Sequence, residues 1–289
     1  MATRVIRIKL GNNGNIGNKM FQYMYCRNLQ ALLPDSELGG YNLPEFGLVS
    51  RDFALEGRIL HIPHGHHHSM ASLAYQLTQG IYDGLLFDGY VQRLEYYPNR
   101  DLCAAHFQSG VTIDRTHLGP DKLTINIRGA EVLRAIHPHY NPVPVSFYEY
   151  IARTTRLEPV IMGQLGDDPY SDEIRRRFSG CVFLPSRSAI EDFEIIRNST
   201  NIAISVSTFS WIAAWLSKTA QTIHLPVSGI LNPRQRGDVD LLPTRDERYR
   251  FYEFPVFPWK ATEEQIQALL APAPNFRPIT PAEARALIS

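Results

Sequence analysis

Aliphatic and polar side chains alternate from Val5 to Leu10, a period of two that is typical of a β-strand. A loop of glycine and asparagine follows over residues 11–18. Apolar residues then recur at helical spacing from Met20 to Leu33, where a proline ends the run. A strand, a glycine loop and a helix in this order are typical of the opening of an α/β unit that binds a nucleotide.

Strands and helices alternate more regularly from about residue 120 onward. Strands are expected at residues 123–127, 160–162, 182–184, 202–206 and 222–225, and helices between them at 146–154, 171–178, 189–198 and 209–217. Strands joined by helices of about ten residues form parallel sheets with right-handed crossovers. We therefore expect an α/β protein of two Rossmann-like domains that face each other across a cleft, with ligands bound at the carboxyl ends of the strands.

The expected domain boundary lies in the break near residues 110–120, just before the alternation becomes regular. We predict an N-terminal α/β domain over residues 1–118 and a C-terminal α/β domain over residues 119–245. The chain becomes rich in proline and aromatic residues after Pro226. We expect residues 246–289 to form a tail that packs back across the domain junction.

Composition narrows the class of protein. The 29 Lys+Arg and 29 Asp+Glu residues cancel, and 44% of the 289 residues are hydrophobic, which excludes a disordered chain and argues against a nucleic-acid partner. Three cysteines at wide spacing indicate neither a disulfide framework nor a zinc site, and they fit a reduced, cytoplasmic compartment. No run approaches the ~18 apolar residues of a membrane span, so we expect a soluble protein, with peripheral association left open.

The first candidate site is the glycine loop and the start of its helix. Gly14 and Gly17 permit a tight turn and a close approach of a ligand to the backbone, and Asn18 follows them. Exposed amides at a helix start favour an anion or sugar hydroxyls. The alternative is a turn that only begins a helix, because the spacing matches neither a dinucleotide fingerprint nor a phosphate-binding P-loop.

The second candidate is the segment Asn126–Glu131, at the end of a predicted strand. Arg128 would extend from the carboxyl edge of the sheet, and its planar guanidinium matches the geometry of a diphosphate. The alternative is a surface arginine just beyond a strand.

The third candidate follows the predicted strand at 202–206. Ser207 or Thr208 would cap the next helix and leave hydroxyls and amides for phosphate oxygens, although a capped helix alone would look the same. Asp192, on the preceding helix, could accept the paired N–H donors of a guanine or lie solvated on a helix face.

Three segments in this order resemble the bacterial α-1,2-fucosyltransferases, glycosyltransferase family 11. Residues 14–23 are similar to the family's GGLGNQMFQYA, residues 89–97 to its GYWQSEKYF, and residues 207–216 to its SSFSWWAAWL. The resemblance covers roughly residues 4–226 and is most specific at its two ends.

The resemblance implies a GT-B-like fold and inverting transfer of a sugar, most specifically fucose from GDP-fucose, to a hydroxyl of a glycan acceptor. It implies no catalytic metal and no other cofactor, with the acceptor on the N-terminal domain and the nucleotide-sugar on residues 119–245. Arg128 falls on the arginine that holds the diphosphate, and Asp192 falls where a carboxylate reads guanine. The other donor-binding positions are Asn126, Ser207, Thr208, Phe209, Ser210, Gly14, Gly17 and Asn18.

Three signature residues of the family's HxRRxD-type motif, HVRRGD, differ in this sequence. Asn126 replaces its histidine, Gly129 its second arginine and Glu131 its aspartate. These changes keep two alternatives open: a glycosyltransferase that uses another nucleotide-sugar, and a non-catalytic protein that binds a GDP-sugar or glycan. Glu131 is the first choice for the general base, with His139 and Asp88 as alternatives.

A cluster of histidines lies between His61 and His68. Imidazoles bind zinc or nickel readily, but no neighbouring carboxylate or cysteine completes a recognisable spacing. We interpret the cluster as a solvent-exposed loop.

Overall fold

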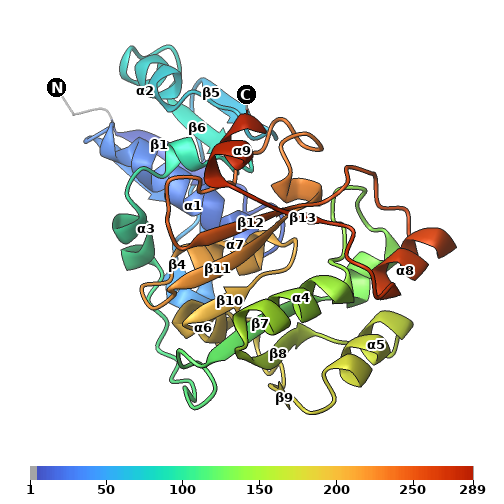
Figure 1. Ribbon diagram of the computed structural model, residues 1–289. Helices are drawn as coiled ribbons and strands as arrows, with labels where there is room; N and C mark the ends of the chain where they lie inside the picture. The colour runs from blue at the N-terminus through green and yellow to red at the C-terminus, as the bar shows by residue number, and fades with distance from the viewer. Residues whose placement is uncertain (1–4, 289) are drawn as a thin grey trace. The chain divides into compact units, whose positions relative to one another are not determined.

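The computed structural model describes residues 5–288 and divides them into two compact units (Figure 1). Unit 1 runs to Gly110 and includes the short segment Asp238–Leu241, and unit 2 holds Val111–Gly237 and the chain from Leu242 onward. The division therefore falls a few residues before the predicted boundary at 118/119. The first residues of the predicted N-terminal domain, 1–4, lie outside the described part of the chain.

Unit 1 contains a sheet of four parallel strands in the order β2-β1-β6-β5. Its strands are β1 (Ile6–Leu10), β2 (Ser36–Gly39), β5 (Ile59–Ile62) and β6 (Gly84–Phe87). Its helices are α1 (Ile16–Ala31), α2 (Met70–Thr78) and α3 (Arg100–His106). A small hairpin of β3 (Asn42–Leu43) and β4 (Leu48–Val49) completes the unit.

The sequence pattern explains this unit. In β1 the apolar residues Ile6, Ile8 and Leu10 are buried, as their alternation predicts. Helix α1 begins directly after the glycine loop, so the predicted order of strand, loop and helix is confirmed. The strand order reverses between β1 and β6, which brings the loops after these two strands together at the carboxyl edge.

Unit 2 contains a sheet in the order β13-β12-β11-β10-β7-β8-β9, coloured in Figure 1 from green at β7 to red at β13. Its strands are β7 (Lys122–Arg128), β8 (Glu158–Gln164), β9 (Val182–Phe183), β10 (Asn201–Ala203), β11 (Thr222–Val227), β12 (Tyr249–Glu253) and β13 (Arg277–Ile279). Its helices are α4 (Val145–Thr155), α5 (Pro169–Arg177), α6 (Ala189–Asn198), α7 (Thr208–Trp215), α8 (Glu263–Leu270) and α9 (Pro281–Ala286).

Apart from the antiparallel edge strand β13, the strands of unit 2 are parallel. The chain first builds β7, β8 and β9 outward, then crosses back to place β10, β11 and β12 on the other side of β7. This is the order of a doubly wound nucleotide-binding sheet, in which the reversal between the first and fourth strands is the usual ligand site. The predicted α/β class with parallel sheets is confirmed.

Residues 246–289, which the sequence predicted as a tail packing across the domain junction, add β12 and β13 to the sheet of unit 2. Tyr249 and Phe251 alternate with an exposed arginine in β12, a strand pattern that the surrounding prolines and aromatic residues obscure. The indole of Trp259 donates to the backbone oxygen of Val132 at 2.8 Å and fixes the chain beyond the strand.

No helix among residues 5–288 is long and apolar enough to cross a membrane.

A buried histidine joins two central strands of unit 2. His224 on β11 is 3% exposed, and its Nδ1 lies 2.8 Å from the hydroxyl of Tyr252 on β12. Burial, reinforced by the nearby positive charge of Arg250, lowers the pKa of His224 to about 3. The imidazole of His224 therefore takes up a proton at a much lower pH in the native state than in the unfolded chain.

We expect His224 to weaken the native state progressively as the pH falls from about 6.5 towards about 3. Each pH unit in this window is worth about 1.4 kcal/mol for one proton, so the loss at pH 4.5 is up to about 3 kcal/mol. Denaturant unfolding at pH 7 and pH 4.5 measures it. His224→Gln should lose stability less steeply than the wild type, whereas His67→Gln, at an exposed histidine, should not. Identical pH dependence in all three proteins would contradict the assignment.

Candidate functional site

The candidate site lies at the carboxyl edge of the unit 2 sheet, where the strand order reverses between β7 and β10. Arg128 is the last residue of β7, and Val206 lies in the loop between β10 and α7. A guanidinium nitrogen of Arg128, Nη1, donates to the backbone oxygen of Val206 at 3.3 Å. The structure therefore brings the predicted arginine to the Ser207–Ser210 corner that the sequence singled out separately.

Two further groups hold the Arg128 guanidinium in place. Its carbon Cζ lies 4.7 Å from the ring centroid of Tyr140, and its Nη2 lies 3.4 Å from Oε1 of Glu131. The side chain is 15% exposed, and the Glu131 side chain is 38% exposed. Arginine carries five N–H donors, and the hydrogen bonds of Arg128 to residues in the range 5–288 use two of them. A fixed and partly desolvated guanidinium with donors to spare is suited to binding a diphosphate.

The hydroxyls of the corner are largely used inside the protein. Ser207 caps α7 by accepting a hydrogen bond from the backbone N–H of Phe209 at 3.2 Å. The hydroxyls of Ser205 and Ser210 lie 3.2 Å apart, and Ser205 also donates to Oδ1 of buried Asn126 at 2.8 Å. These contacts fix the shape of the loop. They leave its backbone, rather than the side chains of Asn126 and Ser210, as the part of the corner suited to phosphate oxygens.

Asp192 is brought to the same edge by the packing of α6 on α7. The rings of Phe193 and Phe209 meet edge to face, with centroids 5.8 Å apart. Ser186 donates to Oδ2 of Asp192 at 2.5 Å, whereas Oδ1 is buried and accepts no hydrogen bond from any residue in the described range 5–288. Burial raises the pKa of Asp192, and the neighbouring charge of Glu191 adds to the shift. A carboxylate with one unsatisfied oxygen is suited to the paired N–H groups of a guanine.

The predicted residues of the glycine loop belong to unit 1. Gly14 has φ 80°, and a Cβ there would lie 2.3 Å from Nδ2 of Asn18, so a glycine is required. Asn18 accepts a hydrogen bond from Nε2 of Gln92 at 2.8 Å, and Gly17 is buried in the first turn of α1. These residues build the loop after β1.

The three candidates for the general base differ in their surroundings. Glu131, in the short helical turn Ala130–Arg134, is engaged with Arg128, as described above. His139 lies in the following loop, with its ring 5.3 Å from that of His137. Asp88 follows β6 in unit 1 and contacts His61 and Asn13.

Sequence reasoning missed several contacts that shape the site. Tyr140 stacks on Arg128, Ser186 donates to Asp192, and the backbone oxygen of Val206 accepts from Arg128. No periodic pattern along the chain signals these contacts, because they depend on how strand ends, loops and helix starts pack against one another.

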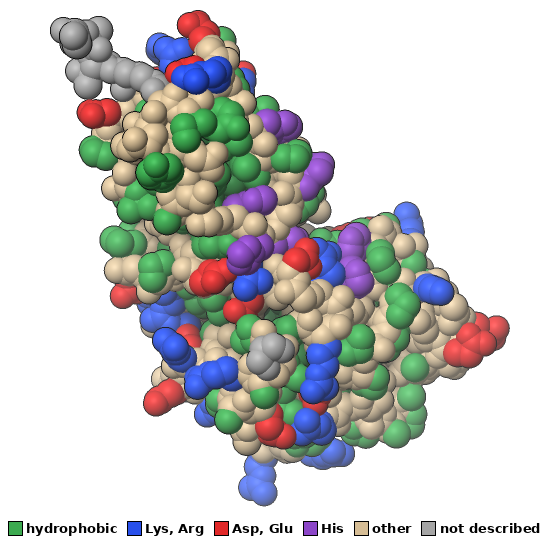
Figure 2. All heavy atoms as spheres, turned by 90° about the horizontal axis from the view of Figure 1, so that it is seen from above, with side chains coloured by type: hydrophobic (Ala, Val, Ile, Leu, Met, Phe, Trp, Pro, Cys, Tyr) green, Lys and Arg blue, Asp and Glu red, His purple; other side chains and the backbone are tan. Residues whose placement is uncertain are grey.

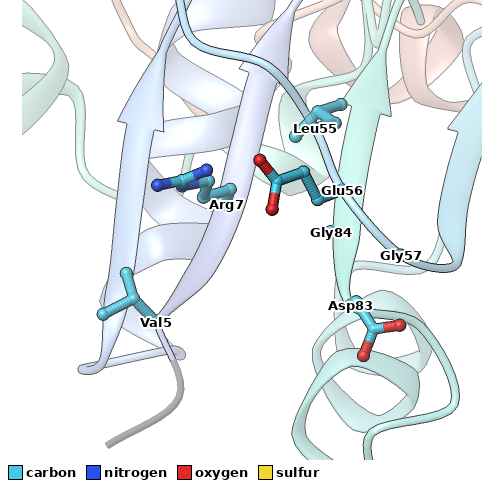
Figure 3. A pocket seen from close by; sticks show the side chains of 7 residues that line it. All are labelled: Val5, Arg7, Leu55, Glu56, Gly57, Asp83 and Gly84. Atoms are coloured by element: carbon cyan, nitrogen blue, oxygen red, sulfur yellow. The ribbon is translucent and has the colours of Figure 1, made fainter. Parts of the chain in front are cut away.

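Two other surface features, a cavity in unit 1 and a group of histidines, are weaker candidates for a functional site. A cavity of about 500 Å³ in unit 1 is lined by Arg7 of β1, by Glu56 of the loop before β5 and by Asp83, which directly precedes β6 (Figure 3). It lies at the amino ends of the strands, the edge opposite to the usual ligand site. Histidine side chains gather on the face drawn in Figure 2, but no group of three or more metal-binding side chains is found within residues 5–288.

Gly129, which replaces the second arginine of the resembled motif, is fixed by its neighbour on β8. A Cβ at this position would lie 2.9 Å from the backbone oxygen of Gln164, closer than real Cβ atoms approach. A side chain here requires the β7 and β8 backbones to shift. The backbone at this position therefore has no room for the side chain of a second arginine unless the strands move.

We expect Gly129→Ala to lower the free energy of unfolding by about 1–3 kcal/mol, the usual cost of overpacking. Thermal or denaturant unfolding measures the change. Gly180→Ala is the matched control, because nothing lies within 4 Å of a Cβ at that position. If the two variants have the same free energy of unfolding, β7 and β8 move to accommodate the Cβ without loss of stability, which contradicts the prediction.

Sequence comparison gives no independent support for a family. No model of a known protein family matches the chain, and no curated protein matches it. The resemblance to the α-1,2-fucosyltransferases therefore rests on the three segments that carry it.

Proposed function

We propose that the protein is an inverting glycosyltransferase that moves a sugar, most specifically fucose from GDP-fucose, to a hydroxyl of a glycan. The observation that carries this proposal is the contact between Arg128 and the backbone of Val206 at the reversal of the strand order. It joins a diphosphate-binding cation to a phosphate-binding loop at the edge where doubly wound sheets hold nucleotides.

The proposed chemistry is stabilisation of the leaving group. As the bond between the sugar and the diphosphate breaks, negative charge builds on the departing GDP. Arg128 is held by Val206, Tyr140 and Glu131, so its donors need little reorganisation when that charge develops. Removal of one such donor typically costs ~10²–10³ in rate.

The choice of a guanine nucleotide rests on Asp192. Its unsatisfied, buried Oδ1 and its Ser186-bound Oδ2 are two acceptors on α6, whose next residue, Phe193, packs on Phe209 of α7. Guanine offers two adjacent N–H donors, whereas adenine and uracil do not offer this pair.

A second candidate function is binding of a GDP-sugar or glycan without catalysis. The contact between Glu131 and Arg128, at 3.4 Å, favours it, because a carboxylate beside the guanidinium offsets part of the charge available to a diphosphate. Gly129 leaves no second arginine to compensate. Use of a different nucleotide-sugar is the remaining alternative.

The proposal includes three finer points from the sequence. They are a GT-B-like pair of Rossmann-like domains with the acceptor on unit 1 and the donor on unit 2, a cytoplasmic location, and the absence of a catalytic metal or nucleic-acid partner. Peripheral association with a membrane stays open.

GDP should stabilise the wild-type protein against unfolding by ~2.7 kcal/mol at one hundred times its Kd. Arg128→Ala should weaken GDP binding by ~10–150-fold, the equivalent of the ~1.5–3 kcal/mol of a hydrogen bond to a charged group. Calorimetric titration with GDP measures the affinity. Arg134→Ala, at an exposed arginine in the same segment, is the matched control. The diphosphate assignment is wrong if Arg128→Ala binds GDP as tightly as the control.

Asp192→Asn should raise stability and weaken nucleotide binding together. Because the native pKa of Asp192 is raised, its ionised form disfavours the folded state at pH 7, and the neutral amide should gain about 1 kcal/mol after solvent screening. The same change removes an acceptor for guanine, so affinity for GDP should fall by ~10-fold or more while affinity for ADP stays the same.

Calorimetric titration with GDP and with ADP, beside denaturant unfolding, tests both effects. Asp172→Asn, at a carboxylate whose side chain is 71% exposed, controls for loss of charge. An unchanged ratio of GDP to ADP affinity would remove Asp192 from the base-reading role.

A further inference from the structure

We propose that unit 1 carries a carbohydrate-binding site of its own, built on Tyr90 and Asp88 of the β6 loop, residues 88–92. The ligand class is a neutral sugar with one apolar face, such as the terminal galactose of a glycan. The inference deepens the proposed function, on whose choice of a glycan as partner it rests, and it uses no residue of unit 2.

The backbone of the β6 loop is strained at Val91. This residue is buried and has φ 46°, in the left-handed region that a β-branched side chain rarely adopts. Such a conformation costs free energy and persists only where the surrounding structure imposes it, and residues of this kind concentrate at ligand sites. The strained residue directly follows Tyr90 and sets the path of the backbone that carries this ring.

Hydrogen bonds hold the β6 loop in this conformation. The backbone N–H groups of Tyr90 and Val91 both donate to the backbone oxygen of Gly65, at 2.8 and 3.3 Å. The hydroxyl of Tyr97 donates to the backbone oxygen of Val91 at 2.8 Å. The loop is therefore tied to the segment after β5 and to Tyr97, and a loop that is ordered in advance loses little entropy when a ligand binds.

The ring of Tyr90 belongs to a stack of aromatic side chains. It lies nearly parallel to the ring of His66, with centroids 5.6 Å apart, and to the ring of His64, with centroids 6.4 Å apart. His66 is buried, Tyr90 is half-buried and His64 is exposed. The stack therefore presents aromatic surface to solvent. Tyrosine combines an apolar ring face with a polar tip, which suits a sugar with its own apolar and polar faces.

Polar groups are fixed at the start of the same loop. Oδ1 of Asp88 accepts from Nδ2 of Asn13 at 2.7 Å, and its Oδ2 lies 2.9 Å from Nε2 of His61. A Cβ on Gly11 would lie 1.5 Å from Oδ1 of Asp88, so only glycine leaves room for the carboxylate. A carboxylate has about four acceptor positions, of which these contacts use two, so it retains capacity for sugar hydroxyls.

His61 adds an acceptor that reaches solvent. Its side chain is 50% exposed, against 14% for Asp88. An ionised carboxylate only accepts hydrogen bonds, so we assign the proton of His61 to Nε2, which leaves the lone pair on Nδ1. The strands before Asn13, Asp88 and the histidine loop are adjacent in the order β1-β6-β5. An amide, a carboxylate and an imidazole on adjacent strand ends suit neighbouring hydroxyls, each of which donates and accepts.

Two buried amide oxygens of unit 1 are an independent observation. Gln92, which ends the β6 loop, is 2% exposed, and its Nε2 donates to Oδ1 of Asn18 at 2.8 Å. Gln22 on α1 is 0% exposed, and its Nε2 donates to the backbone oxygen of Asn13 at 3.4 Å. Within residues 5–288 neither Oε1 atom accepts a hydrogen bond. Unpaired buried acceptors destabilise a protein, and a ligand rich in hydroxyls supplies donors, directly or through an ordered water.

The charges of this segment favour a neutral ligand. Asp88 is negative, and Arg93, the one basic residue within positions 88–95, is paired with Glu95 at 2.6 Å. An anionic sugar would therefore meet the charge of Asp88 with no nearby arginine of this segment left to offset it. A galactoside suits the aromatic stack, because its axial 4-hydroxyl leaves several C–H groups together on the opposite face of the ring.

The test is calorimetric titration of the protein with lactose and, separately, with galacturonate. Lactose should bind the wild type more tightly than galacturonate, and Asp88→Asn should narrow this difference, because it removes the negative charge. Tyr90→Ala should weaken lactose binding ~10-fold or more, because it removes the stacking surface. Tyr90→Phe keeps the ring and should bind lactose more tightly than Tyr90→Ala.

Tyr75→Ala is the matched control, because Tyr75 of α2 is a tyrosine of the same unit whose side chain is 63% exposed. Thermal unfolding establishes that each variant is folded. Equal lactose affinity in Tyr90→Ala and Tyr75→Ala, or tighter binding of galacturonate than of lactose by the wild type, overturns the inference.

Titration of the wild type with GDP separates this inference from the proposed nucleotide site. GDP binding without lactose binding overturns the carbohydrate site and leaves the diphosphate assignment standing. Lactose binding that depends on Tyr90, without GDP binding, supports the carbohydrate site and overturns the nucleotide-sugar donor.

Discussion

The Arg128 guanidinium, held against the backbone of Val206, is the interaction on which the candidate site depends. It exists because β7 and β10, which are far apart in the sequence, are neighbours at the reversal of the strand order. No crossover connects the two strands directly at this point, so their carboxyl ends leave room for loops that would elsewhere be covered. The cation, the loop before α7 and the packing of α6 on α7 all follow from that adjacency.

Unit 1 also has a reversal of strand order, but different side chains lie beside it. Its strand order reverses between β1 and β6, and the loops there gather Asn13, Asp88 and the neighbouring His61 instead of an arginine. One reversal point carries a cation suited to a leaving diphosphate, and the other carries an imidazole backed by a carboxylate.

The residues that differ from the resembled motif are explained by their neighbours in the structure. Gly129 is required by the backbone oxygen of Gln164, so the missing second arginine is accommodated by the way β7 meets β8. Asn126 accepts from Ser205 and thereby supports the corner from inside the sheet. Asp192 is held half-buried with one oxygen unsatisfied, a loss of stability that a ligand would recover.

The sequence by itself determined the α/β class, the strand–loop–helix opening and most strands of unit 2, because periodicity and turn residues act over a few neighbouring positions. It also identified Arg128, the Ser207–Ser210 corner and Asp192 as separate candidates. Only the tertiary structure decided that these meet at one edge, that Tyr140 and Ser186 support them, that Asp88 stands behind His61, and that residues 246–289 extend a sheet. Strand order and contacts between loops depend on packing between distant segments, which leaves no periodic signal along the chain.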